Sequence, residues 1–225
     1  MTAVDAPTIA ERVAAVPRPA PVMSRAAAAR LTERQRDLLD GLTALIADGF
    51  AHLTMADIAA ALECSLRTLY GIAASRDALV LVACDRNLWA TGRRARQALE
   101  SEATERSALE AVRRYLHAAT HAVDRTTSRF AADLASVPGG LDLRRAHSEY
   151  LVAVTTALLD LAVDTGEMPA VDTPVVARAM ADVADVFIRP EVIDTLPGTP
   201  KQAADLVVDL LLRGLGGSAQ WEGAR

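Results

Sequence analysis

The strongest constraint on the fold is the spacing of apolar residues, which recur every three or four positions through most of the chain after Leu31. This spacing places the apolar side chains of each segment on one face of a helix. Threonine or serine precedes most of the segments, where its hydroxyl can accept a hydrogen bond from an unpaired helix N–H. No segment of useful length alternates apolar and polar residues as a half-buried strand would. The sequence therefore predicts an all-α protein.

The helix boundaries follow from caps, prolines and glycines. Thr173 and Thr199 each precede a proline, which is typical of an N-cap followed by the first helical residue. Pro190 is expected to end the first of these two helices, and the glycines at 214, 216 and 217 to end the second. The predicted helices cover about 32–48, 54–62, 65–70, 75–99, 107–123, 128–136, 142–164, 173–189 and 199–214.

Composition excludes several classes of protein. The chain of 225 residues has a net charge of -5, which argues against coating nucleic acid through bulk positive charge. Its two cysteines, Cys64 and Cys84, are too few for a disulfide framework or a zinc site. No apolar run reaches the roughly 18 residues of a membrane span, and the first thirty residues contain no secretory apolar core. We expect a cytoplasmic protein without a membrane partner.

Two short predicted helices, 54–62 and 65–70, are joined by only a few residues, which is typical of a helix-turn-helix. The second helix of that motif lies in the DNA major groove and presents its N-terminal residues to base edges. Arg67 is long enough to pair with guanine O6 and N7, and Leu69 is expected to anchor the helix against Ile58 and Leu62. The predicted base-facing residues are Ser65, Leu66, Arg67 and Thr68.

About fifty residues from Leu31 onward resemble the TetR family of bacterial transcriptional repressors. The resemblance is carried by Gly49-Phe50, Thr54, Asp57-Ile58-Ala59, Ser65, Arg67-Thr68-Leu69-Tyr70 and Ser75-Arg76-Asp77-Ala78-Leu79. It implies a homodimer with an N-terminal DNA-binding domain of three helices and a C-terminal helical domain that binds a small effector. It also implies that Thr54 caps a helix beside a phosphate, that Thr68 and Tyr70 face DNA, and that Arg76 contacts backbone phosphate.

The chain departs from the family pattern at the turn. Glu63 stands where the family usually has glycine, and a positive φ there costs a glutamate on the order of 1 kcal/mol or more. It also brings a negative charge toward DNA. Between Leu31 and Val80, four basic residues stand against seven acidic ones, so binding must rest on a few placed arginines.

The chain divides into four predicted regions. Residues 1–30 contain four prolines and four arginines among small residues, so we expect a flexible arm with a helical stretch near 26–29. The arm is either an inert tail or a basic segment that reaches into a DNA minor groove. Residues 31–75 are predicted to be the helix-turn-helix domain, 76–216 the ligand-binding and dimerisation domain, and 217–225 a flexible tail.

The middle helices carry the large side chains that could line an effector pocket, since such sites are apolar with a few polar tips. These residues could equally be plain core. They are Trp89, Tyr115, Phe130, His147 and Tyr150. His117 and His121 could share a metal site with Asp124 and His147, but we favour a polar helix flank and predict neither metal nor cofactor.

The sequence is therefore interpreted as a ligand-responsive transcriptional repressor that is released from a palindromic operator. Two copies are expected to dimerise through the helices at about 173–189 and 199–214. The apolar dimer surface would comprise Val175, Val176, Ala179, Val183, Val186, Phe187, Leu206, Val207, Leu210 and Leu211. Phosphate loops, nucleophile elbows and metalloprotease motifs are missing, so we expect no enzyme. The alternative is a helical-bundle binding protein or small enzyme without operator binding.

Overall fold

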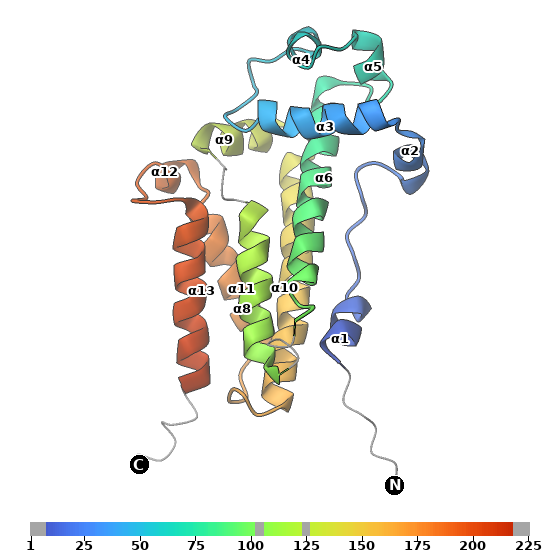
Figure 1. Cartoon of the computed structure of the whole chain (residues 1–225). Coiled ribbons are helices and arrows are strands. Elements are labelled where there is room, and N and C mark those ends of the chain that lie inside the picture. The colour runs from blue at the N-terminus through green and yellow to red at the C-terminus, as the bar shows by residue number, and fades with distance from the viewer. Residues whose placement is uncertain (1–7, 102–105, 123–126, 218–225) are drawn as a thin grey trace, which may run out of the picture.

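The computed structural model describes residues 8–101, 106–122 and 127–217, and all regular secondary structure in these ranges is helical (Figure 1). The prediction of an all-α protein is confirmed. The elements in chain order are α1 (Ile9–Ala15), α2 (Arg25–Arg30), α3 (Glu33–Leu45), α4 (Met55–Ala61), α5 (Leu66–Tyr70), α6 (Arg76–Gln97), α8 (Ala108–Ala119), a 3-10 turn (Thr120–Ala122), α9 (Ser128–Ser136), α10 (Gly140–Asp164), α11 (Thr173–Val186), α12 (Pro190–Ile193) and α13 (Pro200–Gly217).

The helices form two layers that share α6. Helices α3, α4 and α5 lie at one end of the molecule, and α8, α10, α11 and α13 form a bundle along the rest of it (Figure 1). The first half of α6 packs into the core of the small layer through Leu79, Val80 and Ala83. Its second half enters the bundle core, where Ala95 packs with Tyr115. One rigid helix therefore connects the two parts.

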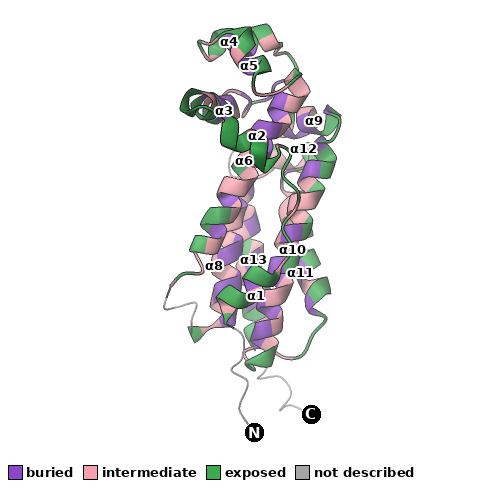
Figure 2. Ribbon diagram, turned by 90° about the vertical axis from the view of Figure 1, so that its right-hand side faces the viewer, coloured by how far each residue is buried: buried purple, intermediate pink, exposed green. Residues whose placement is uncertain are grey.

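The bundle core is built from the inward faces of amphipathic helices, as the apolar spacing predicts. Figure 2 shows buried residues running along the inner sides of these helices while the outer sides stay exposed. Val154, Leu158 and Leu159 of α10 and Met180 of α11 are among the most deeply buried side chains. No helix within the described residues has both the length and the apolar character needed to cross a bilayer.

Most predicted caps hold, but the two Thr-Pro pairs differ. Thr199 accepts a hydrogen bond from the Gln202 N–H at 3.2 Å, as an N-cap should. Asp172, and not Thr173, caps α11, because its carboxylate accepts the Val175 N–H at 3.1 Å. The Thr173 hydroxyl is occupied elsewhere, since it donates to Asp160.

Two predicted helix ends are also wrong. Helix α11 already ends at Val186, and Pro190 begins α12, which suits a residue that has no N–H to donate. Helix α13 continues to Gly217 through the glycines expected to end it. A glycine inside a helix costs only about 1 kcal/mol, and Leu212 and Leu215 still pack against the bundle core over this last stretch.

The N-terminal segment differs most from the sequence prediction. Helix α2 confirms the helical stretch expected near 26–29, but the arm also contains α1, whose Val13 is only 5% exposed because it packs into the bundle core. Thr8 and Glu11 form a capping box at the start of α1, and Arg12 Nη2 lies 2.6 Å from Asp164 Oδ2 of α10. Residues 8–31 therefore form a strap that runs along the bundle to α3 (Figure 1). Residues 1–7 of the arm and 218–225 of the predicted tail lie outside the described residues.

Candidate nucleic-acid interface and effector region

The turn between α4 and α5 has the hydrogen bonds of a Schellman motif. The Cys64 N–H donates to the Ala59 carbonyl at 2.9 Å and the Glu63 N–H to the Ala60 carbonyl at 3.2 Å. This motif requires a left-handed residue, and Glu63 has a φ of 49°. Glu63 therefore has the positive φ that costs a glutamate on the order of 1 kcal/mol or more. Arg34 Nη2 reaches the Leu62 carbonyl at 3.4 Å, so the start of α3 lies against this turn.

The second helix of the motif is anchored on one side and exposed on the other. Leu69 is buried in the same core as Ile58, as expected from the sequence. Arg67 is exposed, and so are Leu66, at 43%, and Tyr70, at 54%. Helix α5 lies at the end of the molecule away from the bundle (Figure 1). It therefore has the position of a recognition helix.

Several polar residues expected to face DNA are bonded within the protein. The Ser65 and Thr68 hydroxyls lie 2.8 Å apart, and the Ser65 oxygen also accepts the Thr68 N–H at 3.1 Å. Thr54 and Asp57 form a capping box at α4, where hydrogen bonds from Thr54 hold the pKa of Asp57 below its usual value. These side chains shape the motif and have fewer free groups to offer a ligand.

Arg76 is also engaged within the protein, and the phosphate contact that the resemblance implies for it stays a prediction. Its guanidinium lies 2.7 Å from Asp77 Oδ1 and donates to the carbonyls of Ala51 and Leu53, both at 3.2 Å. These bonds tie the loop between α3 and α4 to the start of α6. Arg76 therefore has a structural role in the described chain, since it holds this loop against α6.

Three of the five residues predicted to line an effector pocket lie together between α6 and α10. The Trp89 ring centroid lies 5.3 Å from that of His147 and 6.2 Å from that of Tyr150. Trp89 Nε1 and the Tyr150 hydroxyl are buried, and neither has a hydrogen-bond partner among the described residues. Buried polar atoms are normally paired, so these two mark a place where a polar group of another molecule could bind.

The other two predicted pocket residues, Tyr115 and Phe130, do not share this cluster of aromatic rings. Tyr115 packs in the same bundle core as Tyr150, and burial raises the pKa of its phenol. Phe130, on α9, instead packs edge-on against Phe50 at a centroid distance of 5.9 Å. It belongs to the junction between the bundle and the small layer.

That junction is made by α9. Asp133 accepts the backbone N–H groups of Phe50, at 2.5 Å, and Ala51, at 2.8 Å. Gly49 has a φ of +104°, and a side chain there would meet the side chain of Arg129. The loop after α3 is therefore held closely against the bundle.

The sequence did not single out Asp85, which connects the predicted pocket to the strap. Asp85 is buried on α6; Oδ1 lies 2.9 Å from His147 Nε2 and Oδ2 accepts the Val22 N–H at 2.9 Å. Its signal in the sequence is an acidic residue four positions before Trp89, on the apolar face of the predicted helix 75–99.

The sequence also missed a cavity at the far end of the bundle. It has a volume of about 1350 Å³ and lies between α1, the end of α6, the start of α8 and the end of α10. Ile9, Val13 and Leu161 contribute apolar lining, and Arg93 and Arg96 contribute positive charge. Because α1 forms one wall, the cavity could not be anticipated once the N-terminal segment was taken to be flexible.

The histidine metal site, which the sequence allows but does not favour, is not assembled in the part of the chain that the structure describes. His117 Nε2 lies 3.0 Å from Asp209 Oδ1 on α13, while His121 is exposed and His147 bonds Asp85. Asp124 lies outside the described residues. Within the described ranges, no group of three or more His, Cys, Asp or Glu side chains could hold a metal ion.

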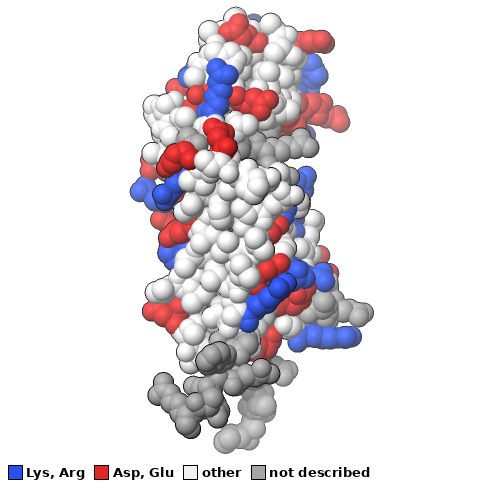
Figure 3. Space-filling model, turned by 90° about the vertical axis from the view of Figure 1, so that its left-hand side faces the viewer, with Lys and Arg blue, Asp and Glu red and all other residues white. Residues whose placement is uncertain are grey.

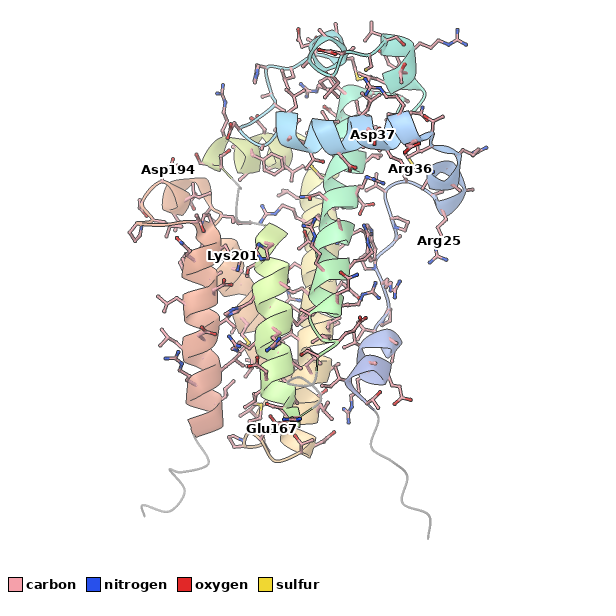
Figure 4. The ribbon with its side chains drawn as sticks, viewed as in Figure 1. Arg25, Arg36, Asp37, Glu167, Asp194 and Lys201 are labelled. Carbon is pink, nitrogen blue, oxygen red and sulfur yellow. The ribbon has the colours of Figure 1, made fainter. Side chains whose placement is uncertain are left out.

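Helix α13 packs against the bundle through buried Val208 and Leu212 and through polar contacts to α8, and its outer side is apolar. Lys201 reaches across to α8, where Nζ donates to the His117 carbonyl at 3.1 Å (Figure 4). On the outer side, Leu206 is 61% exposed, and Val175 of the adjoining α11 is exposed to the same extent. Figure 3, which shows this side of the molecule, has a broad area without charged side chains at mid-height.

No family model and no curated protein matches the sequence. The structure is similar to the TetR-family transcriptional regulator PfmR from Thermus thermophilus, with a TM-score of 0.57, 23% identity and coverage of 78% of this chain and 97% of that one.

Two further solved structures match over similar lengths. A TetR-like transcriptional regulator from Rhodococcus sp. RHA1 matches with a TM-score of 0.60 and 22% identity, covering 84% of this chain and 100% of that one. AibR, in complex with isovaleryl coenzyme A and operator DNA, matches with a TM-score of 0.55 and 19% identity, covering 79% of this chain and 97% of that one. The chain therefore has the fold of the TetR family of transcriptional regulators, with a helix-turn-helix layer on a helical bundle.

Proposed function

We propose that the protein is a DNA-binding transcriptional regulator whose affinity for its operator responds to a small molecule. The observation that carries the proposal is the presentation of α5, with Leu69 buried beneath it and Arg67 exposed on its outer side. An exposed arginine on a short helix can donate two hydrogen bonds to guanine in the major groove. AibR, which shares the fold, has been solved with both an acyl coenzyme A and operator DNA.

A dimer would let two α5 helices bind the two half-sites of one palindrome. Half-sites one helical turn apart require the two helices to lie about 34–36 Å apart. The outer sides of α11 and α13 supply the surface for it. Val175, Leu206 and Leu210 are more than half exposed there, which is unusual for neighbouring large apolar residues on one face. We infer that a second copy covers them.

The effector is proposed to bind beside α6 near Trp89 and Tyr150, whose buried polar atoms have no described partner. Because α6 runs from the bundle core into the small layer, a displacement at this depth also moves the helix-turn-helix. In one conformation of the dimer the two α5 helices have the spacing of the operator half-sites, and in another they do not. A ligand that binds the second conformation more tightly than the first lowers the affinity for DNA.

Selection from a random double-stranded library, followed by mobility-shift titration, tests DNA binding. Wild type is expected to select a palindromic motif, and Arg67→Ala to weaken binding to it by about tenfold or more, the loss of one bidentate base contact. Arg145→Ala is the control, because Arg145 is exposed on α10 away from α5 and pairs only with Asp142 among the described residues. If wild type binds no duplex better than random sequence at low salt, a helical-bundle binding protein or small enzyme becomes the better interpretation.

Light scattering tests the dimer separately. Wild type at micromolar concentration is expected to have the mass of two chains, and Leu206→Glu to have the mass of one, because a carboxylate would be buried without a partner. Leu141→Glu, at an exposed leucine on α10, should remain dimeric. A monomeric wild type contradicts the proposed interface.

A further inference from the structure

The outer side of α5 has an apolar component that the helix-turn-helix does not need for its own stability. Leu66 and Tyr70 are four residues apart, so they lie side by side on the helix, and both are largely exposed. The anchoring function already belongs to Leu69, which is buried. Leu66 and Tyr70 are therefore available to another molecule.

The polar neighbours of Leu66 are less available. The hydroxyls of Ser65 and Thr68 lie 2.8 Å apart and Ser65 also caps the helix, so both have a partner before any ligand arrives. Arg67 is exposed next to Leu66. The first turn of α5 thus offers one cationic and one apolar side chain.

In the DNA major groove, these two kinds of side chain distinguish different bases. Arginine pairs with the O6 and N7 acceptors of guanine, whereas the C5-methyl group of thymine is the apolar feature of a base edge there. Resting on the proposed function, we propose that Leu66 is a specificity-determining residue that selects thymine beside the guanine read by Arg67. Each operator half-site then contains a thymine and a guanine close together.

The selected operator allows a test on a single methyl group. Replacing the thymine with deoxyuridine removes only the C5-methyl, which should weaken wild-type binding about fourfold, the equivalent of one buried methyl-sized group. Leu66→Ala should bind the thymine and deoxyuridine duplexes equally. Leu141→Ala, a change at another exposed leucine outside α5, should discriminate as wild type does. Because Leu66 is exposed, circular dichroism should be the same for all three proteins.

The outcomes separate this inference from the function on which it rests. Wild type that selects a palindrome without a shared thymine, or Leu66→Ala that still discriminates between the two duplexes, overturns the role of Leu66 alone. Wild type that selects no motif overturns the proposed function and the role of Leu66 with it.

Discussion

The helix-turn-helix and the N-terminal strap are both short-helix segments, yet they depend on different information. In the helix-turn-helix, the caps at Thr54 and Ser65 and the anchor Leu69 lie within a few residues of the helices they define. In the strap, α1 also has a local cap, but Asp164 of α10 pairs with Arg12 of α1, and Asp85 of α6 accepts the N–H of Val22 further along the strap. The comparison shows that a capping box predicts a helix start without predicting where the helix packs.

The largest expected effect comes from removing the anchor of α5. Leu69→Ala leaves a cavity beneath α5 and should lower the free energy of unfolding by about 3 kcal/mol, within the range for buried leucines. Urea denaturation measures the loss, and Leu141→Ala, at an exposed leucine, should change little. A small loss would show that the motif does not depend on this contact.

The matching test on the strap is Val13→Ala. Removing two buried methyl groups should cost about 1.5 kcal/mol and detach α1 from α10. Hydrogen exchange should then speed up at residues 8–24 while α4 and α5 keep their protection. Val22→Ala changes an exposed side chain and serves as the control. Unchanged exchange would mean that the strap is held without its core contact.

A smaller effect of opposite sign is expected at the turn. Glu63→Gly removes the backbone strain of a left-handed φ, which costs a residue with a side chain about 1–2 kcal/mol. Glycine has greater backbone freedom in the unfolded chain, which lowers the free energy of unfolding by about 0.5–1 kcal/mol. The net result should be a gain of about 0.5–1 kcal/mol in the free energy of unfolding. Ala60→Gly, within α4, should instead destabilise the protein, and equal effects of both substitutions would argue against strain at Glu63.

The smallest expected effect concerns Glu167, which lines the cavity beside α1. Burial raises its pKa, but hydrogen bonds from the Ser107 hydroxyl and from the Ala108 and Leu109 N–H groups together bring it below the usual 4.5. A lowered folded pKa means that this stabilisation is present above the unfolded pKa and is lost as the pH falls through the folded value. Glu167→Gln should therefore reduce stability at about pH 7 and flatten its decline below about pH 5. Glu149→Gln, at an exposed glutamate, is the control in the same denaturation series.

The candidate site shows where prediction from sequence succeeds and where it stops. Exposure of Arg67 and burial of Leu69 follow from helical spacing in a five-residue helix. The engagement of Arg76 with the carbonyls of Ala51 and Leu53 could not be predicted, because those carbonyls approach it only in the folded chain. Phe130 was grouped with Trp89 by size, but α9 turns it toward Phe50.

Local sequence was enough to predict most of the helices and most of their caps, because these depend on residues within one or two turns of each other. Long-range packing was needed to place residues 8–31 as a strap, to join Val22 to His147 through Asp85, and to open a cavity beneath α1. These features bring together positions that are far apart in the chain, such as Val22 and Asp85. The side chains of one segment carry no signal of which distant surface they will meet.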